Sequence, residues 1–81
     1  MISADDVGRL LAADEKDAVL VVIEGRTEVI GAGRLASAEY RGALEVVARD
    51  DLVQRLGESP SDHEISEQAA QLDTAVSELG G

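Results

Sequence analysis

The chain has very few of the side chains that carry out chemistry in proteins. It contains no Cys, Trp or Phe, and only one His, one Lys and one Tyr among 81 residues. A thiolate metal site, a nucleophile with an activating base and an aromatic platform for stacking nucleobases all need residue types that this composition does not supply. We therefore predict a protein that is not an enzyme and binds no metal or cofactor.

Positive charge is scarce as well. Seventeen Asp and Glu residues stand against seven Lys and Arg residues, and the formal net charge is −10. Nucleic acids and anionic membranes repel such a chain, so we expect neither as a partner, whereas a basic protein would be attracted. The composition is also halophile-like, and the sequence leaves open whether the acids serve a function or an adaptation to salt.

Long hydrophobic runs are missing too. No segment approaches the roughly 18 consecutive apolar residues of a membrane-spanning helix. Residues 1–6 lack the basic and apolar regions of a signal peptide, and the absence of Cys is compatible with a reducing compartment. These features predict a cytoplasmic protein.

The chain does have 44% apolar residues, mostly Leu, Val, Ile and Ala. That share is ordinary for a globular protein, and the length allows one domain over residues 1–81. A core without Trp or Phe buries less area per residue than one rich in aromatics. Because small domains often gain stability by self-association, we expect a homodimer.

Local patterns predict a helix and a buried strand in the first third of the chain. Ser3 suits a helix N-cap, and Val7 and Leu10 share one helical face, so a helix is expected over about 4–13. Residues 18–23 are apolar on both faces and rich in β-branched side chains, which is typical of a strand in the middle of a sheet.

A hairpin is predicted next. Gly25-Arg26 suits a two-residue type II′ turn. The second strand is expected to run from 27 to about 35, and Gly31 and Gly33 within it indicate a bulge or bend.

The following segment, 36–43, is ambiguous between strand and helix. Residues 44–48 are predicted to form a third strand because four of the five are apolar and they include a Val pair. Asp50 or Asp51 is then expected to cap a short helix that Gly57 closes.

The last helix carries an apolar seam with heptad spacing. Ser61 and Glu64 form a predicted capping box at its start. The seam residues, which are also the candidate interaction surface, are Ile65, Ala69, Leu72, Val76 and Leu79. Two heptads are short for a free-standing coiled coil, so the seam is expected to lie on the sheet. Its expected partners there are Val19, Val21, Ile23, Ile30 and Val46.

Together these elements predict a small single-domain α+β fold in the order αβββαα. We expect a three-stranded antiparallel β-meander packed by the long C-terminal helix, with the short N-terminal helix beside that helix. Double-stranded-RNA-binding domains share the order αβββα. They contact phosphate through basic groups that are missing here, so RNA binding is not expected.

One motif points to nucleotides. Residues 29–36 match G-x-G-x-x-G/A after a predicted strand, and Asp50 and Asp51 follow at the distance of a ribose-binding acid. The glycines of such a turn let the backbone approach a pyrophosphate. The short chain and its negative charge count against this function. A bent strand is therefore favoured, and nucleotide binding at Gly31 and Gly33 is an alternative.

A second motif is the terminal Gly80-Gly81, which resembles the tails of ubiquitin-like modifiers and sulfur-carrier proteins. The resemblance implies a terminal carboxylate that is activated by adenylation. Those tails usually follow a strand, whereas this one follows a predicted helix. A helix end closed by Gly is therefore favoured, and the modifier or carrier role is a further alternative.

The acidic residues are better explained as helix-start residues and solvated surface than as a cation site, because no calcium-loop pattern is present. His63 stands without a second metal ligand. The remaining prediction is a protein-interaction or regulatory module whose partner the sequence does not name.

Overall fold

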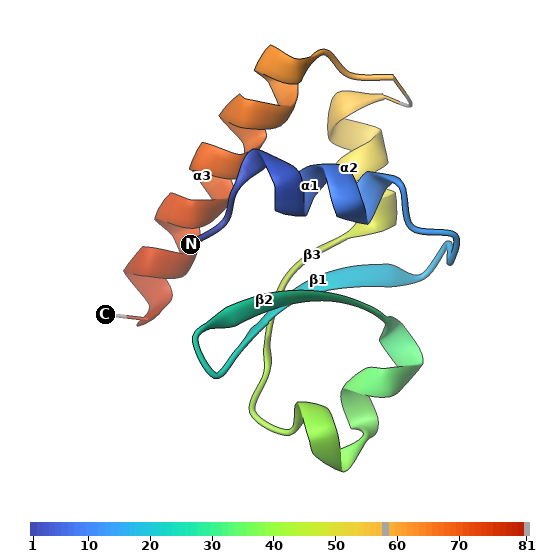
Figure 1. The fold of residues 1–81 in the computed structure, drawn as a ribbon, viewed down its shortest axis with the longest axis vertical. Helices are drawn as coiled ribbons and strands as arrows, with labels where there is room; N and C mark the ends of the chain where they lie inside the picture. Colours follow the sequence, from blue (N-terminus) through green and yellow to red (C-terminus); the bar gives the residue numbers. More distant parts are fainter. Residues whose placement is uncertain (58, 81) are drawn as a thin grey trace.

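The computed structural model describes residues 1–57 and 59–80, which form a three-stranded sheet with helices packed on one side (Figure 1). The α+β class and the order αβββαα are confirmed. The elements are α1 (Ala4–Leu11), β1 (Ala18–Ile23), β2 (Arg26–Gly31), the 3₁₀ turns η1 (Ala32–Ala36) and η2 (Ala38–Tyr40), β3 (Leu44–Ala48), α2 (Arg49–Leu56) and α3 (Asp62–Gly80).

The strand order is β2-β1-β3, and both neighbours run antiparallel to β1. The central position expected for β1 is confirmed. The predicted strand order of a meander is wrong, because β3 pairs with β1 rather than with β2. The strand with the most apolar residues is thus protected on both edges, and η1 and η2 carry the chain across the sheet to reach its far side.

The β1–β2 hairpin turns at Glu24 and Gly25, because Ile23 pairs with Arg26. The φ angles of Glu24 and Gly25 are 51° and 78°, and two positive φ values are typical of a type I′ turn. The predicted Gly25-Arg26 turn of type II′ was therefore displaced by one residue. Gly occupies the second turn position, where it tolerates the left-handed backbone without a Cβ clash.

Strand β2 ends at Gly31, earlier than predicted, because its partner strand ends there. Gly31 pairs with Ala18, the first residue of β1, and the amide of Ala32 donates to the Asp17 carbonyl. Beyond that point no strand is available for pairing, and the chain turns into η1. Most of the ambiguous segment 36–43 lies in 3₁₀ turns and their connections, neither in a strand nor in an α-helix.

Side chains of β1 alternate between the two faces of the sheet. Leu20 joins the larger core cluster with Val7, Leu10, Leu52 and residues of α3. The opposite face holds a second cluster, and its buried members are Val19, Val21, Ile23, Ile30 and Tyr40. The α3 seam packs into the first cluster together with Val46, as predicted, but its other four predicted partners lie on the opposite face.

The helix starts follow the predicted signals closely. Ser3 and Asp6 form a capping box at α1, and Ser61 and Glu64 exchange the two hydrogen bonds of a capping box at α3. Helix α2 differs, since its N-cap is Ala48 and the two Asp residues lie in its first turn. Among the described residues, no helix has both the length and the apolar character that a membrane crossing needs.

Candidate functional site

The predicted interaction seam is mostly buried inside the molecule. Ala69 and Leu72 are 3% and 6% exposed, and Ile65 and Val76 are half-buried against the same cluster. Only Leu79 is freely exposed, at 75%. The middle of the seam is therefore packed into the larger core cluster, and its C-terminal end is exposed. The role of the seam as an interaction surface stays a prediction.

The glycine motif lacks the geometry of a dinucleotide turn. Gly31 has an ordinary φ of −72°, and a five-residue 3₁₀ turn follows it instead of an α-helix. A side-chain carbon at Gly31 would collide with the carboxylate of Glu15. A carboxylate beside Gly31 would oppose the approach of an anionic pyrophosphate, and nucleotide binding at Gly31 and Gly33 stays a prediction. Gly33 faces open space within η1.

The two terminal glycines are only partly covered by the structure. Helix α3 extends to Gly80, so the helix that was expected to precede the Gly-Gly pair is present. Gly81 lies outside the described residues, and the modifier or carrier role stays a prediction.

The acidic residues form no metal centre in the described ranges. No three His, Asp or Glu side chains in 1–57 and 59–80 gather as metal ligands. His63 is exposed on α3 and lies 3.1 Å from the carboxylate of Glu67, one turn along the helix. Such an exposed pair is typical of helix surface electrostatics.

A polar network around Tyr40, which the sequence did not indicate, covers the second core cluster. The Tyr40 hydroxyl donates to one carboxylate oxygen of Glu28 at 2.8 Å, and Arg26 donates to the other oxygen at 2.8 Å. The Tyr40 hydroxyl and then Arg26 hold the pKa of Glu28 below its usual value, while the Glu28 contact and burial raise the pKa of Tyr40. A phenol with a raised pKa stays protonated, so the network is suited to bracing the fold.

Asp6 forms the corresponding polar anchor on the helix side. Its carboxylate accepts hydrogen bonds from Ser3, Arg9 and, across to β2, the Thr27 hydroxyl at 2.8 Å. Burial raises the pKa of Asp6, but the hydrogen bonds from Ser3, Thr27 and Arg9 outweigh it and leave the pKa lowered. Asp6 therefore stays ionised at neutral pH and ties α1 to the sheet.

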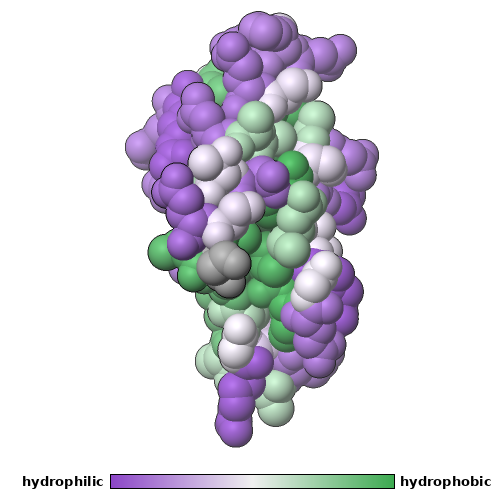
Figure 2. Space-filling model, turned by 90° about the vertical axis from the view of Figure 1, so that its left-hand side faces the viewer, coloured by the Kyte–Doolittle hydropathy of each residue, from purple (hydrophilic) through white to green (hydrophobic). Residues whose placement is uncertain are grey.

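An apolar surface remains uncovered below the C-terminal end of α3 (Figure 2). Val22 and Leu44 are register partners on the helix side of the sheet, and Leu44 is 36% exposed. Val46 and Val76 are half-buried and pack against the larger core cluster, as Val22 does. Leu79 follows Val76 about one turn further along α3. We call these five residues the open face.

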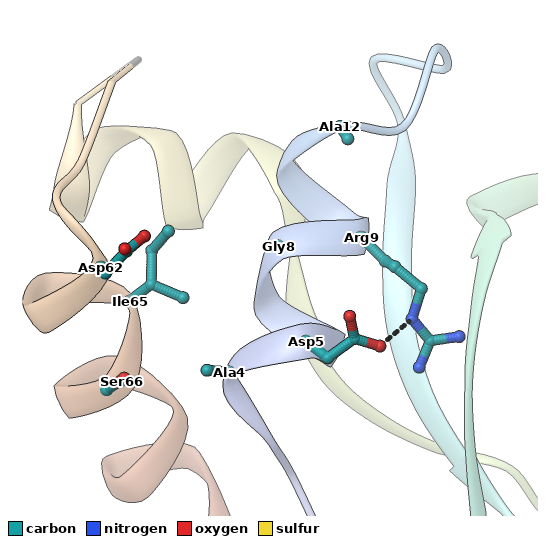
Figure 3. Close-up of a pocket in the computed structure, with 8 residues that line it drawn as sticks. All are labelled: Ala4, Asp5, Gly8, Arg9, Ala12, Asp62, Ile65 and Ser66. Carbon is teal, nitrogen blue, oxygen red and sulfur yellow. Dashed lines mark ion pairs between the residues drawn. The ribbon is translucent and has the colours of Figure 1, made fainter.

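A groove separates α1 from the N-terminal half of α3 (Figure 3). Its volume is about 470 Å³. Ala4, Gly8 and Ala12 follow one another along the α1 wall, and Ile65 projects from α3 toward them. The remaining lining residues are Asp5, Arg9, Asp62 and Ser66. Short side chains on α1 leave this groove open, because they do not reach α3.

Comparisons with known proteins give no family for this chain: no family model matches it, and neither a curated protein nor a solved structure is significantly similar.

Proposed function

We propose that this chain is a non-enzymatic protein-interaction module that docks through its open face. The observation that supports this is a contiguous apolar surface on a chain with a net charge of −10. Single exposed apolar residues are normal on monomers, whereas a contiguous patch with a polar rim is typical of a protein-binding site. None of the five side chains that define the open face is charged.

The occupant proposed for the open face is a second copy of the chain. A two-fold dimer places the same patch of each copy against the other, and an uncharged patch can meet itself without bringing like charges together. Strand β3 lies at the edge of the sheet beside the patch, and its only charged residue is Glu45. The other edge, β2, carries Arg26 and Glu28 in ion pairs, which discourage strand pairing.

Sedimentation equilibrium tests the proposal with single substitutions on and off the open face. We expect the wild-type chain to dimerise, and Leu44→Glu and Leu79→Glu to shift the equilibrium toward monomer because each buries a charge in the interface. Ala38→Glu, in exposed η2 on the other side of the sheet, is the matched control and should leave the dimer intact. A wild-type chain that stays monomeric at its highest soluble concentration contradicts the proposal.

The proposal also retains the cytoplasmic location expected from composition. Basic partners stay an expectation for the molecule as a whole, because the open face itself has no charge with which to attract them.

A further inference from the structure

The groove between α1 and α3 is a second surface, separate from the open face. The open face lies at the C-terminal half of α3, while the groove is lined by Asp62, Ile65 and Ser66 from its N-terminal end (Figure 3). The α1 wall presents Ala4 and Ala12 as exposed side chains. Because the side chains on this wall are small, another helix could approach the α1 backbone closely.

Gly8 lies in the middle of α1 and has open space beside it. Its φ is not in the left-handed region, and a side-chain carbon built there would meet nothing within 4 Å. Gly is less favourable than Ala inside a helix, and no close contact from the described residues requires Gly at this position. The close approach that Gly8 permits is therefore available to a partner.

The charge around the groove is negative. Asp5 and Asp62 are exposed at its rim. Among the described residues that line the groove, Arg9 is the only basic one, and its guanidinium is paired with Asp5 at 3.3 Å and with Asp6. The rim therefore attracts cationic side chains. A second copy that met this groove with its own groove would bring the same acidic rim, so the local charge disfavours a second copy there.

We infer that the groove binds a basic amphipathic helix of another protein. Its apolar stripe would contact Ile65, a small residue would lie over Gly8, and Arg or Lys side chains would reach Asp5 and Asp62. The eight residues of α1 span about 12 Å at 1.5 Å per residue, so about two turns of the partner would lie in contact. This site is independent of the dimer at the open face.

An NMR titration tests the inference with two synthetic helical peptides. One is built from Leu, Ala and Arg with Arg along both flanks, and the other has Glu in place of every Arg. We expect the Arg peptide to shift the amides of Gly8, Ala12, Ile65 and Ser66 while leaving Tyr40 unchanged, and the Glu peptide to shift none. Raising the salt concentration should weaken the complex because the rim contacts are exposed.

Substitutions then locate the binding site. Gly8→Leu should fold normally, since the space is open, and should weaken the Arg peptide at least about tenfold because it fills the groove. Gly33→Leu, also in open space but in η1, is the matched control. Asp62→Asn should weaken binding about threefold, as expected for one exposed ion pair.

Three outcomes would overturn the inference. The first is the absence of groove shifts with the Arg peptide, and the second is equal shifts with both peptides. The third is a dimer that Gly8→Leu converts to monomer, which would assign the groove to a second copy. Failure of the open-face proposal is distinguishable, because that proposal depends on Leu44 and Leu79 and is read by sedimentation without any peptide.

Discussion

The two faces of the sheet are covered in different ways. On one face, α1, α2 and α3 bury a large aliphatic cluster that includes Leu10, Leu20 and Leu52. On the other, two 3₁₀ turns bring the single aromatic residue, Tyr40, over a small cluster of valine and isoleucine. A chain with little aromatic content can therefore protect both faces of a central strand by using helices on one and one large side chain on the other.

On each face, one acidic side chain also forms a hydrogen bond that links the sheet to the element packed on it. Asp6 accepts the Thr27 hydroxyl and joins α1 to β2, while Glu28 accepts the Tyr40 hydroxyl and joins η2 to β2. Arg34 lies 5.3 Å from the centre of the Tyr40 ring and adds a cation–π contact. The polar anchors differ in exposure, since Asp6 is buried and Glu28 is half-buried.

The largest effect is expected at Leu20, which is fully buried on the helix side. Leu20→Ala should lower the free energy of unfolding by about 3–4 kcal/mol through lost contacts and a residual cavity. Val21→Ala, equally buried on the opposite face, should lower it by about 2 kcal/mol because fewer methyl groups are removed. Urea denaturation measures both, and a loss at Val21 as large as the loss at Leu20 would contradict this ranking.

Tyr40 tests the second face directly. Tyr40→Ala should lower the melting temperature by about 10–20 °C because it removes the cover of that cluster. Tyr40→Phe keeps the ring and loses only the hydrogen bond to Glu28, so its melting temperature should fall by much less. Thermal unfolding followed by circular dichroism measures the pair. An alanine variant as stable as the phenylalanine variant would show that η2 does not depend on the ring.

Gln68 offers a gain of stability. Its amide nitrogen is buried without a hydrogen-bond partner among the described residues, and the side chain is 7% exposed. Gln68→Met keeps the length and removes the unpaired donor, so the free energy of unfolding should rise by about 1 kcal/mol. Gln71→Met, exposed three residues further along α3, is the control. A loss of stability in Gln68→Met would contradict the account.

Acid should weaken both anchors. The pKa values of Asp6 and Glu28 are lowered in the folded state, from 3.8 and 4.5. Each contribution is complete above the unfolded pKa and is lost as the pH falls through the lower folded pKa. Stability should therefore drop below about pH 4, and Asp6→Asn should flatten that drop. An unchanged acid dependence in Asp6→Asn would contradict this assignment.

The sequence predicted the helix-covered face better than the other face. Helix caps at Ser3 and Ser61 and the apolar run of β1 are local signals, and each was confirmed. The strand order was missed because the pairing of β3 with β1 depends on contacts between residues that are distant in the sequence. The 3₁₀ turns were missed because residues 32–43 have no helical or alternating period, and Tyr40 packs from η2 against side chains that are distant in the sequence.

For the open face and the groove, too, local sequence signals were informative and contacts distant in the sequence were not predictable. Leu79 was predicted as part of a surface, but burial of Ala69 and Leu72 could be known only from the position of α1. The groove had no sequence signal beyond small residues at 4, 8 and 12. Small residues in a helix are common, and only the packing of α3 shows that these line a groove.

The most direct test of the proposed function is a dilution series with methyl-labelled protein followed by NMR. Dimerisation through the open face predicts concentration-dependent shifts at the methyl groups of Val22, Leu44 and Leu79, with those of Val19 and Val21 on the opposite face unchanged. Methyl shifts that do not depend on concentration, or that appear chiefly at Val19 and Val21, would contradict the proposal that this chain docks a second copy through its open face.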